Sequence, residues 1–573
     1  MSLYPIPNLP FAIDTTRWDE FQPRYAALRD QPLDAGNLHD WLHDWSELNK
    51  LVEEVGSIAY IETTLDTTDK SKEAAFLNYV ENIQPNFRLA DQALRERLMA
   101  WLSDGQRLES DLAVPFRKIQ NQADLFRPDN VPLMTELAKL GKEYDKITGG
   151  LKADWNGEEK NLSQLDSLLR DGDRDVRDHA WKTIMSLWQS QRQALNDLYR
   201  RMLELRHQIA LNAGLPDFRA YSFRAMDRFD YTPEDSLRFH DAIEAVVVPA
   251  AGRLHERRRQ KLGLTQLRPW DLNVDPTAAP PLKPYRGQNE LIQGSLNIFN
   301  RVDPALAREF ALMAEENLLD LDTRAGKALG GYCSALVTRQ RPFIFMNGDG
   351  KHDDVQTMLH EAGHAFHAFS CFKLPYIWQM DVPMEFCEVA SMGMELLAAP
   401  YLTAENGGFY TPAEAARARL EHLGGILTFL PYMAVVDAFQ HWVYTHPESA
   451  MDPASCDSAW DELWARFMPG VDWTGFEEER KSGWHRKLHI FHIPFYYIEY
   501  GMAQVGSLQV WRNALRDQAQ AVDTYKQALA LGGTKTLPQL FLAAGAEFRF
   551  DRDMLAELVT LIENTMAKLE VVA

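Results

Sequence analysis

The stretch TMLHEAGHAFHAF, residues 357–369, contains the pattern H-E-x-x-H at His360, Glu361 and His364. In an α-helix, residues four apart lie on one face, so both imidazoles can point at one metal ion. Glu361 then lies beside the open coordination position, where a general base acts on an activated water. The stretch therefore predicts a helix that holds a catalytic zinc ion.

The residues around this pattern also favour a helix. Val355, Met358 and Ala362 supply apolar positions at helical spacing, and Asp353 or Asp354 can cap the N-terminus. The chain has 16 histidines among 573 residues, and the pattern arises by chance in roughly 3 of 100 such chains. A surface helix with two unrelated histidines is the alternative, so a third metal ligand is needed to support the zinc site.

A second segment offers that ligand, because a catalytic zinc ion usually has three protein ligands and one open position. The stretch PMEFCEVASMGMELL, residues 383–397, predicts a helix that begins near Pro383. Glu385, Glu388 and Glu395 lie on this helix at offsets of three and seven, which places them on roughly one face. Spacing alone leaves the choice between these carboxylates open.

A third segment, HRKLHIFHIPFYYIEYGMAQ at residues 485–504, is rich in histidine and tyrosine. Pro494 suits the first turn of a helix, on which Tyr500 shares a face with both Tyr496 and Tyr497. Imidazole and phenol groups can donate hydrogen bonds to a developing oxyanion. A buried aromatic helix is the alternative, but beside a zinc motif we favour the catalytic interpretation.

Most of the remaining chain shows helical periodicity. Trp41, Trp45, Leu48, Val52 and Val55 are spaced by three and four residues, which predicts a helix with one apolar face. A very long helix is expected from Asp175 to Gly214, and others are expected at 288–300 and 303–320.

Two places predict β-structure. Asn156-Gly157 predicts a hairpin over about 150–162. The stretch before the zinc motif predicts two short strands, at about 332–338 and 342–347. An exposed strand edge at this position could pair with an extended peptide and hold its backbone without recognising its sequence.

Charge and sequence pattern disfavour several classes of function. The formal net charge is −22, which disfavours nucleic acid and anionic membranes as partners. The N-terminal residues lack the basic region of a signal peptide, and no run approaches 18 consecutive apolar residues. The four cysteines include no C-x-x-C pair, which is typical of reduced thiols in a cytoplasmic protein.

With these residues assembled, the chain resembles the thimet-oligopeptidase and oligoendopeptidase F family of zinc metallopeptidases, and most closely its bacterial oligoendopeptidase F branch. The resemblance extends in order through the C-terminal half. It rests on PWDL (269–272), GGYC (330–333), PFIFMNGDG (342–350), HEAGHAFH (360–367), EFCEVASMGMEL (385–396) and HIFHIPFYYIEYGMAQ (489–504).

The resemblance implies roles for individual residues of the two zinc helices. The family pattern E-x-x-S-x-x-x-E falls on Glu388, Ser391 and Glu395, which selects Glu388 over Glu385 as the third zinc ligand beside His360 and His364. Glu395 could orient a ligand imidazole, although a surface carboxylate is nearly as good an interpretation.

The resemblance also implies that His489, Tyr497 and Tyr500 face the substrate. The local spacing differs between branches of the family, so Tyr496 and His492 remain alternatives. Together with Glu361 as general base, these side chains make up the expected catalytic set.

The implied fold is mainly α, with two helical lobes around a deep channel and a zincin-type catalytic core. A small β-sheet is expected beside the HExxH helix. We expect an N-terminal lobe over residues 1–270 and a catalytic lobe over 271–573, with an approximate boundary and interleaved lobes.

The implied function is zinc-dependent hydrolysis of internal bonds in short unstructured peptides, with one Zn²⁺ per chain. A zinc exopeptidase of the same clan and a non-catalytic peptide-binding protein on the same fold are the alternatives. Peptides are the expected partners, in the cytoplasm. The sequence does not give the oligomeric state.

Overall fold

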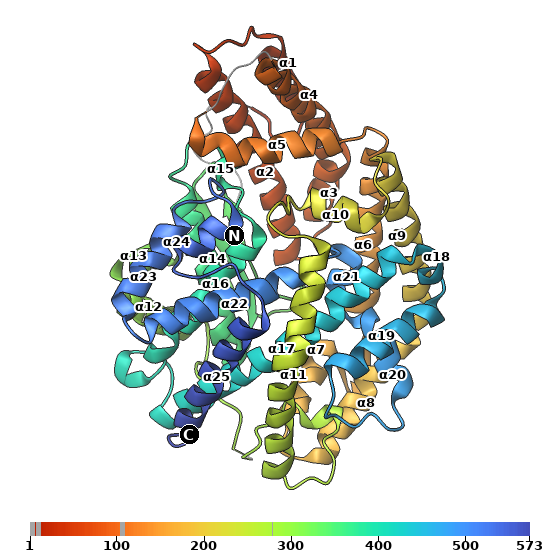
Figure 1. Cartoon of the computed structure of the whole chain (residues 1–573), viewed down its shortest axis with the longest axis vertical. Helices are drawn as coiled ribbons and strands as arrows, with labels where there is room; N and C mark the ends of the chain where they lie inside the picture. Colours follow the sequence, from red (N-terminus) through yellow and green to blue (C-terminus); the bar gives the residue numbers. More distant parts are fainter. Residues whose placement is uncertain (1–5, 7–12, 104–108, 278) are drawn as a thin grey trace. The chain divides into compact units, whose positions relative to one another are not determined.

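The structure is a computed structural model that describes residues 6, 13–103, 109–277 and 279–573 (Figure 1). The described chain is mainly α-helical, as the sequence predicts, with one two-stranded and one three-stranded sheet. It divides into two compact units. The first unit comprises Met1–Pro128, Lys283–Ala415 and Gly506–Phe548, and the second comprises Asp129–Leu282, Ala416–Val505 and Arg549–Ala573.

Each unit is assembled from three separate segments, and the expected boundary at residue 270 lies inside the second unit. Two helices continue from one unit into the other, α17 (Pro412–Thr445) and α22 (Tyr497–Ala514). The longer helices of the first unit are α1 (Trp18–Asp30), α2 (Leu38–Leu65), α3 (Lys70–Asn78), α4 (Gln84–Ser103), α5 (Ala113–Leu125), α12 (Gln288–Val302), α13 (Pro304–Glu315), α14 (His352–Cys371), α16 (Met384–Ala398), α23 (Gln518–Leu529) and α24 (Leu537–Ala543). Those of the second are α6 (Asn130–Gly149), α7 (Leu162–Ser167), α8 (Arg174–Ser190), α9 (Arg192–Asn212), α10 (Phe218–Ala225), α11 (Pro233–Lys261), α19 (Pro453–Phe467) and α25 (Arg552–Leu569).

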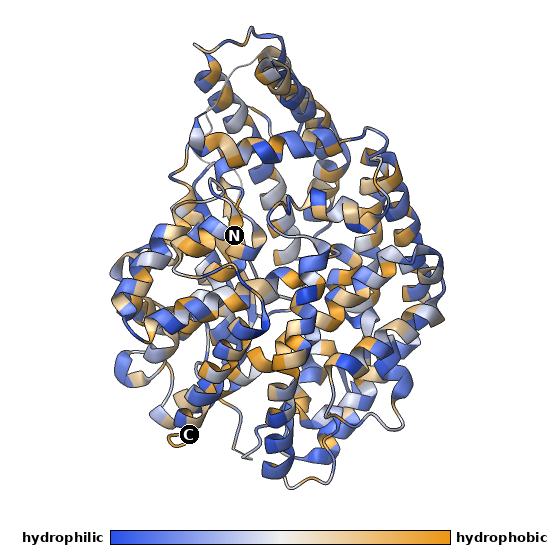
Figure 2. Ribbon diagram, viewed as in Figure 1, coloured by the Kyte–Doolittle hydropathy of each residue, from blue (hydrophilic) through white to orange (hydrophobic). Residues whose placement is uncertain are grey.

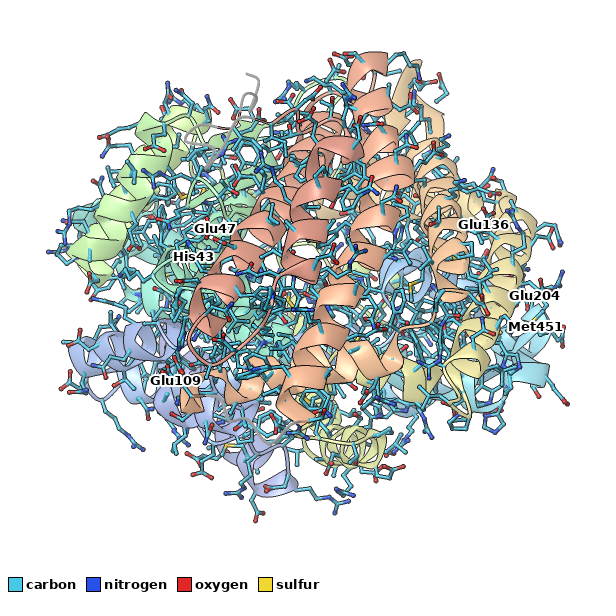
Figure 3. The ribbon with its side chains drawn as sticks, turned by 90° about the horizontal axis from the view of Figure 1, so that it is seen from above. His43, Glu47, Glu109, Glu136, Glu204 and Met451 are labelled. Atoms are coloured by element: carbon cyan, nitrogen blue, oxygen red, sulfur yellow. The ribbon has the colours of Figure 1, made fainter. Side chains whose placement is uncertain are left out.

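Helix α2 shows how the apolar periodicity produces the core of the first unit. The five apolar residues predicted to share a face, from Trp41 to Val55, are all buried. The indole of Trp45 donates to Oδ1 of Asp91 at 2.8 Å, which satisfies its polar atom inside the core. On the same helix His43 is exposed and Glu47 pairs with Lys50 at 2.8 Å (Figure 3). Most helices likewise carry both hydrophobic and hydrophilic residues (Figure 2).

The three-stranded sheet of the first unit has the order β3-β5-β4, so the central strand is β5 (Arg341–Gly348). It pairs in antiparallel fashion with β4 (Tyr332–Leu336), which confirms the two predicted strands. It also pairs in parallel with β3 (Leu319–Asp322), a segment that we predicted as the end of a helix over 303–320. The helix is present, but its predicted end was wrong. Helix α13 stops at Glu315, Asn317 has a positive φ of 56°, and Leu319–Asp322 then pairs with β5.

Helices α14 and α16 pack against each other in the first unit, and β4 and β5 lie along α14. Gly363 permits the close approach of the two helices. A Cβ atom built on Gly363 would lie 2.6 Å from the carbonyl oxygen of Ala390 and 2.6 Å from Cα of Ser391. Only glycine leaves room for main-chain contact at this distance.

The N-terminus of α14 differs from the predicted cap. Neither Asp353 nor Asp354 is the cap residue, because the helix begins at His352 and Lys351 precedes it. Asp354 lies in the first turn instead, where its carboxylate accepts three main-chain N–H groups and the hydroxyl of Tyr285. The three donors are the N–H groups of Asp349, Gly350 and Lys351. The carboxylate thus fixes the loop that leads from β5 into α14.

The second unit confirms one prediction and corrects another. β1 (Lys152–Trp155) and β2 (Glu158–Asn161) form the predicted hairpin, with positive φ at both turn residues. The single long helix expected from Asp175 is instead two helices, α8 and α9, separated at Gln191.

The segment that carries the predicted tyrosines also differs from expectation. Pro494 is not in the first turn of a helix. A short helix, α21 (Leu488–His492), ends before it, and α22 begins at Tyr497. Phe495 between them has φ of 71°, which is unusual for a bulky residue.

One helix has the length and composition of a membrane span. The most apolar 18-residue window of α17 has a mean hydropathy of 1.4, and 72% of that window is buried inside the protein. These 18 residues do not form an unbroken apolar run in the sequence. Its burial is typical of a core helix in a large globular chain.

Candidate active site

Three predicted metal ligands converge in the first unit. Oε2 of Glu388 lies 3.3 Å from Nε2 of His360 and 3.6 Å from Nε2 of His364. The ligand atoms of all three side chains lie within 4.8 Å of one another. The two imidazoles come from successive turns of α14, and the carboxylate comes from the facing side of α16.

These separations fit a zinc ion. Two ligand atoms that each lie about 2.0–2.2 Å from a tetrahedral zinc ion are about 3.3–3.6 Å apart. Glu388 is buried, whereas both imidazoles are partly exposed. Two imidazoles with one carboxylate are also a common donor set of catalytic zinc sites, in which the fourth position stays open.

Glu395 lies behind the first of these ligands. Its Oε1 is 2.7 Å from Nδ1 of His360. A carboxylate only accepts hydrogen bonds, so Nδ1 carries the proton and Nε2 is left with the lone pair that a metal needs. Burial opposes protonation of His360, but contacts with Glu388 and Glu395 outweigh this effect and raise its pKa. Metal binding at Nε2 therefore competes with a proton.

Ser391 also contributes to the candidate site. The sequence placed it in the pattern E-x-x-S-x-x-x-E but assigned it no role. Its hydroxyl donates to Oε2 of Glu388 at 3.0 Å and also contacts the main-chain oxygen of Glu388 at 3.0 Å. The side chain is fully buried. It therefore fixes the orientation of the carboxylate from one turn further along α16.

Glu361 is buried beside the three ligands. Burial raises the pKa of Glu361 to about 7, and the carboxylates of Glu388 and Glu395 act in the same direction. His360 and a hydrogen bond from the main-chain N–H of Cys333 lower it. A carboxyl group with a pKa near neutrality can both accept and return a proton.

The contact from Cys333 could not be found in the sequence. The donor is a main-chain N–H, which every residue except proline offers, and it comes from strand β4. The contact depends on β4 lying beside α14. This hydrogen bond is therefore visible only in the three-dimensional structure and not from the residue type.

A third histidine of the HEAGHAFH stretch, His367, lies outside the metal-binding set. It is buried, its ring packs against Phe386 with centroids 5.8 Å apart, and burial lowers its pKa to about 3. Burial likewise lowers the pKa of His364 to about 4. The imidazoles of His364 and His367 are therefore neutral at pH 7.

His489, Tyr497 and Tyr500 come together in the second unit. The ring centroid of His489 lies 5.0 Å from that of Tyr497 and 5.8 Å from that of Tyr500. Tyr496 belongs to the same cluster, at 5.9 Å from His489 and 5.2 Å from Tyr500. Tyr497 and Tyr500 therefore share a face of α22, whereas Tyr496 precedes the helix but still packs against Tyr500. The choice between Tyr496 and Tyr497 stays open.

The other histidines of this segment have separate partners. Nε2 of His492 lies 2.9 Å from Oδ1 of Asp145, and Nε2 of His485 lies 2.7 Å from Oδ1 of Asn196. These contacts favour His489 over His492 as the histidine of the tyrosine cluster.

Two buried arginines anchor the main chain of this segment. Arg206 donates to the carbonyl oxygens of Ile490 and Phe491. Arg228 donates to the carbonyl oxygen of Phe495 at 2.5 Å and to Oε1 of Glu499 at 2.7 Å. Neither arginine could be found from the sequence, because each lies more than 250 residues away from this segment.

Known proteins share both the sequence features and the fold. An oligoendopeptidase F homolog from Borreliella burgdorferi is 20% identical over 514 residues, which cover 86% of this chain and 84% of the relative. The solved structure of PZ peptidase A with an inhibitor matches with a TM-score of 0.90 and 26% identity, over 97% of this chain and 98% of that chain. A 3.1 Å structure of a protein assigned as an oligoendopeptidase F has a TM-score of 0.89 and 28% identity, with the same coverage.

Family profiles match most of the chain. The profile of the peptidase M3 N-terminal domain matches residues 10–126, and the profile of peptidase family M3 matches residues 167–560. The second match spans well over half of the sequence and includes the candidate metal ligands, Glu361 and the tyrosine cluster. The resemblance inferred from the sequence motifs is thereby confirmed, and the chain belongs to peptidase family M3.

Proposed function

We propose that this peptidase is a zinc-dependent oligoendopeptidase that hydrolyses internal bonds of short, unstructured peptides. The observation that carries the proposal is the convergence of His360, His364 and Glu388 on one point, with Glu361 buried beside them. In this proposal the three residues hold one Zn²⁺ per chain. When bound, zinc would polarise the peptide carbonyl and make water a nucleophile near pH 7.

Glu361 acts as the general base. Its carboxylate accepts a proton from the attacking water and returns it to the amine that leaves. The carboxylate also accepts a hydrogen bond from the main-chain N–H of Cys333, which restrains its orientation. Glu395 keeps the imidazole of His360 in the tautomer that binds metal.

His489, Tyr497 and Tyr500 act on the substrate side. Imidazole and phenol groups can donate hydrogen bonds to the oxyanion that develops on the carbonyl carbon. Loss of one such donor typically lowers turnover by about 10²–10³. The contacts within the cluster support a shared role, because each ring restrains the orientation of its neighbours.

Strand β4 is the proposed binding edge for the peptide backbone. It lies at the edge of the sheet and pairs only with β5 among the described strands. Its Cys333 also contacts Glu361. An extended peptide that adds to this edge would be held through main-chain hydrogen bonds, which suits varied sequences. We place the enzyme in the cytoplasm, with peptides as its partners.

A metal assay and a blocked peptide test the proposal. Purified protein should contain about one zinc ion per chain, and Glu388→Ala should lose it, whereas Glu385→Ala should retain it. A fluorogenic peptide blocked at both ends should be cleaved internally, and a chelator should stop the reaction. Cleavage that requires a free peptide end would favour an exopeptidase. Binding of peptides without any cleavage by zinc-loaded protein would favour a non-catalytic role.

A further inference from the structure

Lys487 lies in the second unit beside the tyrosine cluster. Its ammonium nitrogen is 3.7 Å from the ring centroid of Tyr497 and 5.6 Å from that of Tyr432. The centroids of the two rings are 6.0 Å apart and the rings are nearly perpendicular. The ammonium group therefore lies next to two aromatic rings. Lys487 is two residues before His489 and is only partly exposed.

This lysine makes no ion pair with any carboxylate of the described residues. The absence is unusual here, because the chain has 82 acidic against 60 basic residues. The most buried lysines of the described chain each have a carboxylate partner. They are Lys50 with Glu47, Lys118 with Asp381, and Lys327 with Asp320.

The neighbours of Lys487 do not supply a negative charge either. Arg486 is cationic and donates to the main-chain oxygen of Glu479 at 3.0 Å. Tyr432 and Tyr497 stay neutral, because burial raises the pKa of both phenols. Burial alone lowers the pKa of Lys487 to about 7, with no carboxylate acting against it.

A poorly solvated ammonium without a counterion is unfavourable, and an anion that reaches it gains a charge-assisted hydrogen bond. The anion would lie beside the tyrosine cluster, because the Tyr497 ring that contacts the ammonium also packs against His489, with centroids 5.0 Å apart. The site thus has the chemistry of a carboxylate receptor, in which aromatic rings contact the cation and no acid among the described residues neutralises it.

We propose that Lys487 binds a carboxylate of the peptide substrate, so that the enzyme prefers peptides with an acidic group near the cleaved bond. This inference rests on the proposed function, which assigns His489, Tyr497 and Tyr500 to the substrate. The carboxylate is either the C-terminal group of the peptide or the side chain of an acidic residue.

A set of matched fluorogenic peptides tests the inference. One pair differs only in a free or amidated C-terminus, and a second pair differs only in Glu or Gln downstream of the cleaved bond. For at least one pair, kcat/KM of the zinc-loaded wild type should fall about tenfold on loss of the charge, which corresponds to about 1.4 kcal/mol. The pair that responds identifies the carboxylate.

Variants assign the preference to Lys487. Lys487→Met keeps the apolar stem over Tyr497 and should remove the preference, and Lys487→Arg should retain it. Lys481→Met, which removes the same charge from a side chain that is paired with Glu478, is the matched control and should behave as wild type. Equal rates for both members of both pairs in the wild type overturn the inference without any variant. Persistence of the preference in folded Lys487→Met also overturns it, whereas failure of the wild type to cleave any peptide overturns the proposed function instead.

Discussion

Gly363 of α14 lies in main-chain contact with Ser391 of α16. A Cβ atom on Gly363 would be 2.6 Å from Cα of Ser391, a separation that real Cβ atoms do not show. Gly363 immediately precedes His364, and Ser391 holds the carboxylate of Glu388. The contact therefore sets the distance between the helix that carries the two imidazoles and the helix that carries Glu388, the third candidate ligand.

Gly363→Ala should force the two helices apart. Overpacking of this kind costs about 1–3 kcal/mol of unfolding free energy, against a gain of up to about 1 kcal/mol from the better helix propensity of alanine. The melting temperature should fall and zinc should bind more weakly. Gly425→Ala is the control, since Gly425 is exposed on α17 with no atom near its missing Cβ, and it should be neutral or stabilising. A Gly363→Ala protein with wild-type stability and zinc affinity would show that this contact does not set the distance between α14 and α16.

Glu395→Ala should weaken zinc binding without removing a ligand. The carboxylate fixes the tautomer and the orientation of His360, and loss of such a partner typically costs about 10–100-fold in metal affinity. A competition titration with a chromophoric chelator measures the affinity. Glu405→Ala, at an exposed position of the same unit, should leave it unchanged. An unaltered zinc affinity in Glu395→Ala would show that Glu395 does not support metal binding.

Arg228→Met should destabilise the second unit. Glu499 is buried and contacts Arg228 at 2.7 Å, so removal of the arginine takes the opposite charge of this pair away from a buried carboxylate, at a cost of about 3–5 kcal/mol. The double variant with Glu499→Leu should recover much of this loss in urea unfolding experiments. Arg201→Met, at a half-exposed pair with Glu143, should have a small effect. Equal stability of the single and double variants would contradict the pairing.

The proposed preference for a carboxylate should depend on pH. The pKa of Lys487 is lowered to about 7, so the side chain is charged below this pH and neutral above it. The ratio of kcat/KM for the acidic and neutral peptides should be highest near pH 6 and should decline toward pH 8. Titration of Glu361 cancels in this ratio, because both peptides use the same base. Lys487→Arg should give a flat ratio, since a guanidinium stays charged. A wild-type ratio that is flat or rises with pH would contradict the assignment.

The sequence was most informative where the chemistry is local. The H-E-x-x-H pattern placed two imidazoles on one helical face, and the apolar spacing of α2 predicted its buried side. Spacing could not choose among Glu385, Glu388 and Glu395. The structure places Glu388 beside both imidazoles and Glu395 against the far nitrogen of His360, which depends on how α16 packs against α14.

Other features depended on partners that are distant in the chain. Leu319–Asp322 forms a strand only because β5 is available for parallel pairing. Phe495 adopts positive φ where Arg228 and Gln440 bind its main-chain oxygen and N–H. Local propensity carries no information on such contacts, which explains the errors at residues 303–320 and at Pro494.

The most direct test of the central claim is peptide hydrolysis by Glu361→Gln. The substitution keeps the size of the side chain and its ability to accept from Cys333, but removes the group that takes a proton. The protein should fold, contain about one zinc ion per chain, and cleave the end-blocked peptide at least about 10²-fold more slowly than wild type, in line with the usual contribution of a general base. Near wild-type cleavage by zinc-loaded Glu361→Gln would contradict the account.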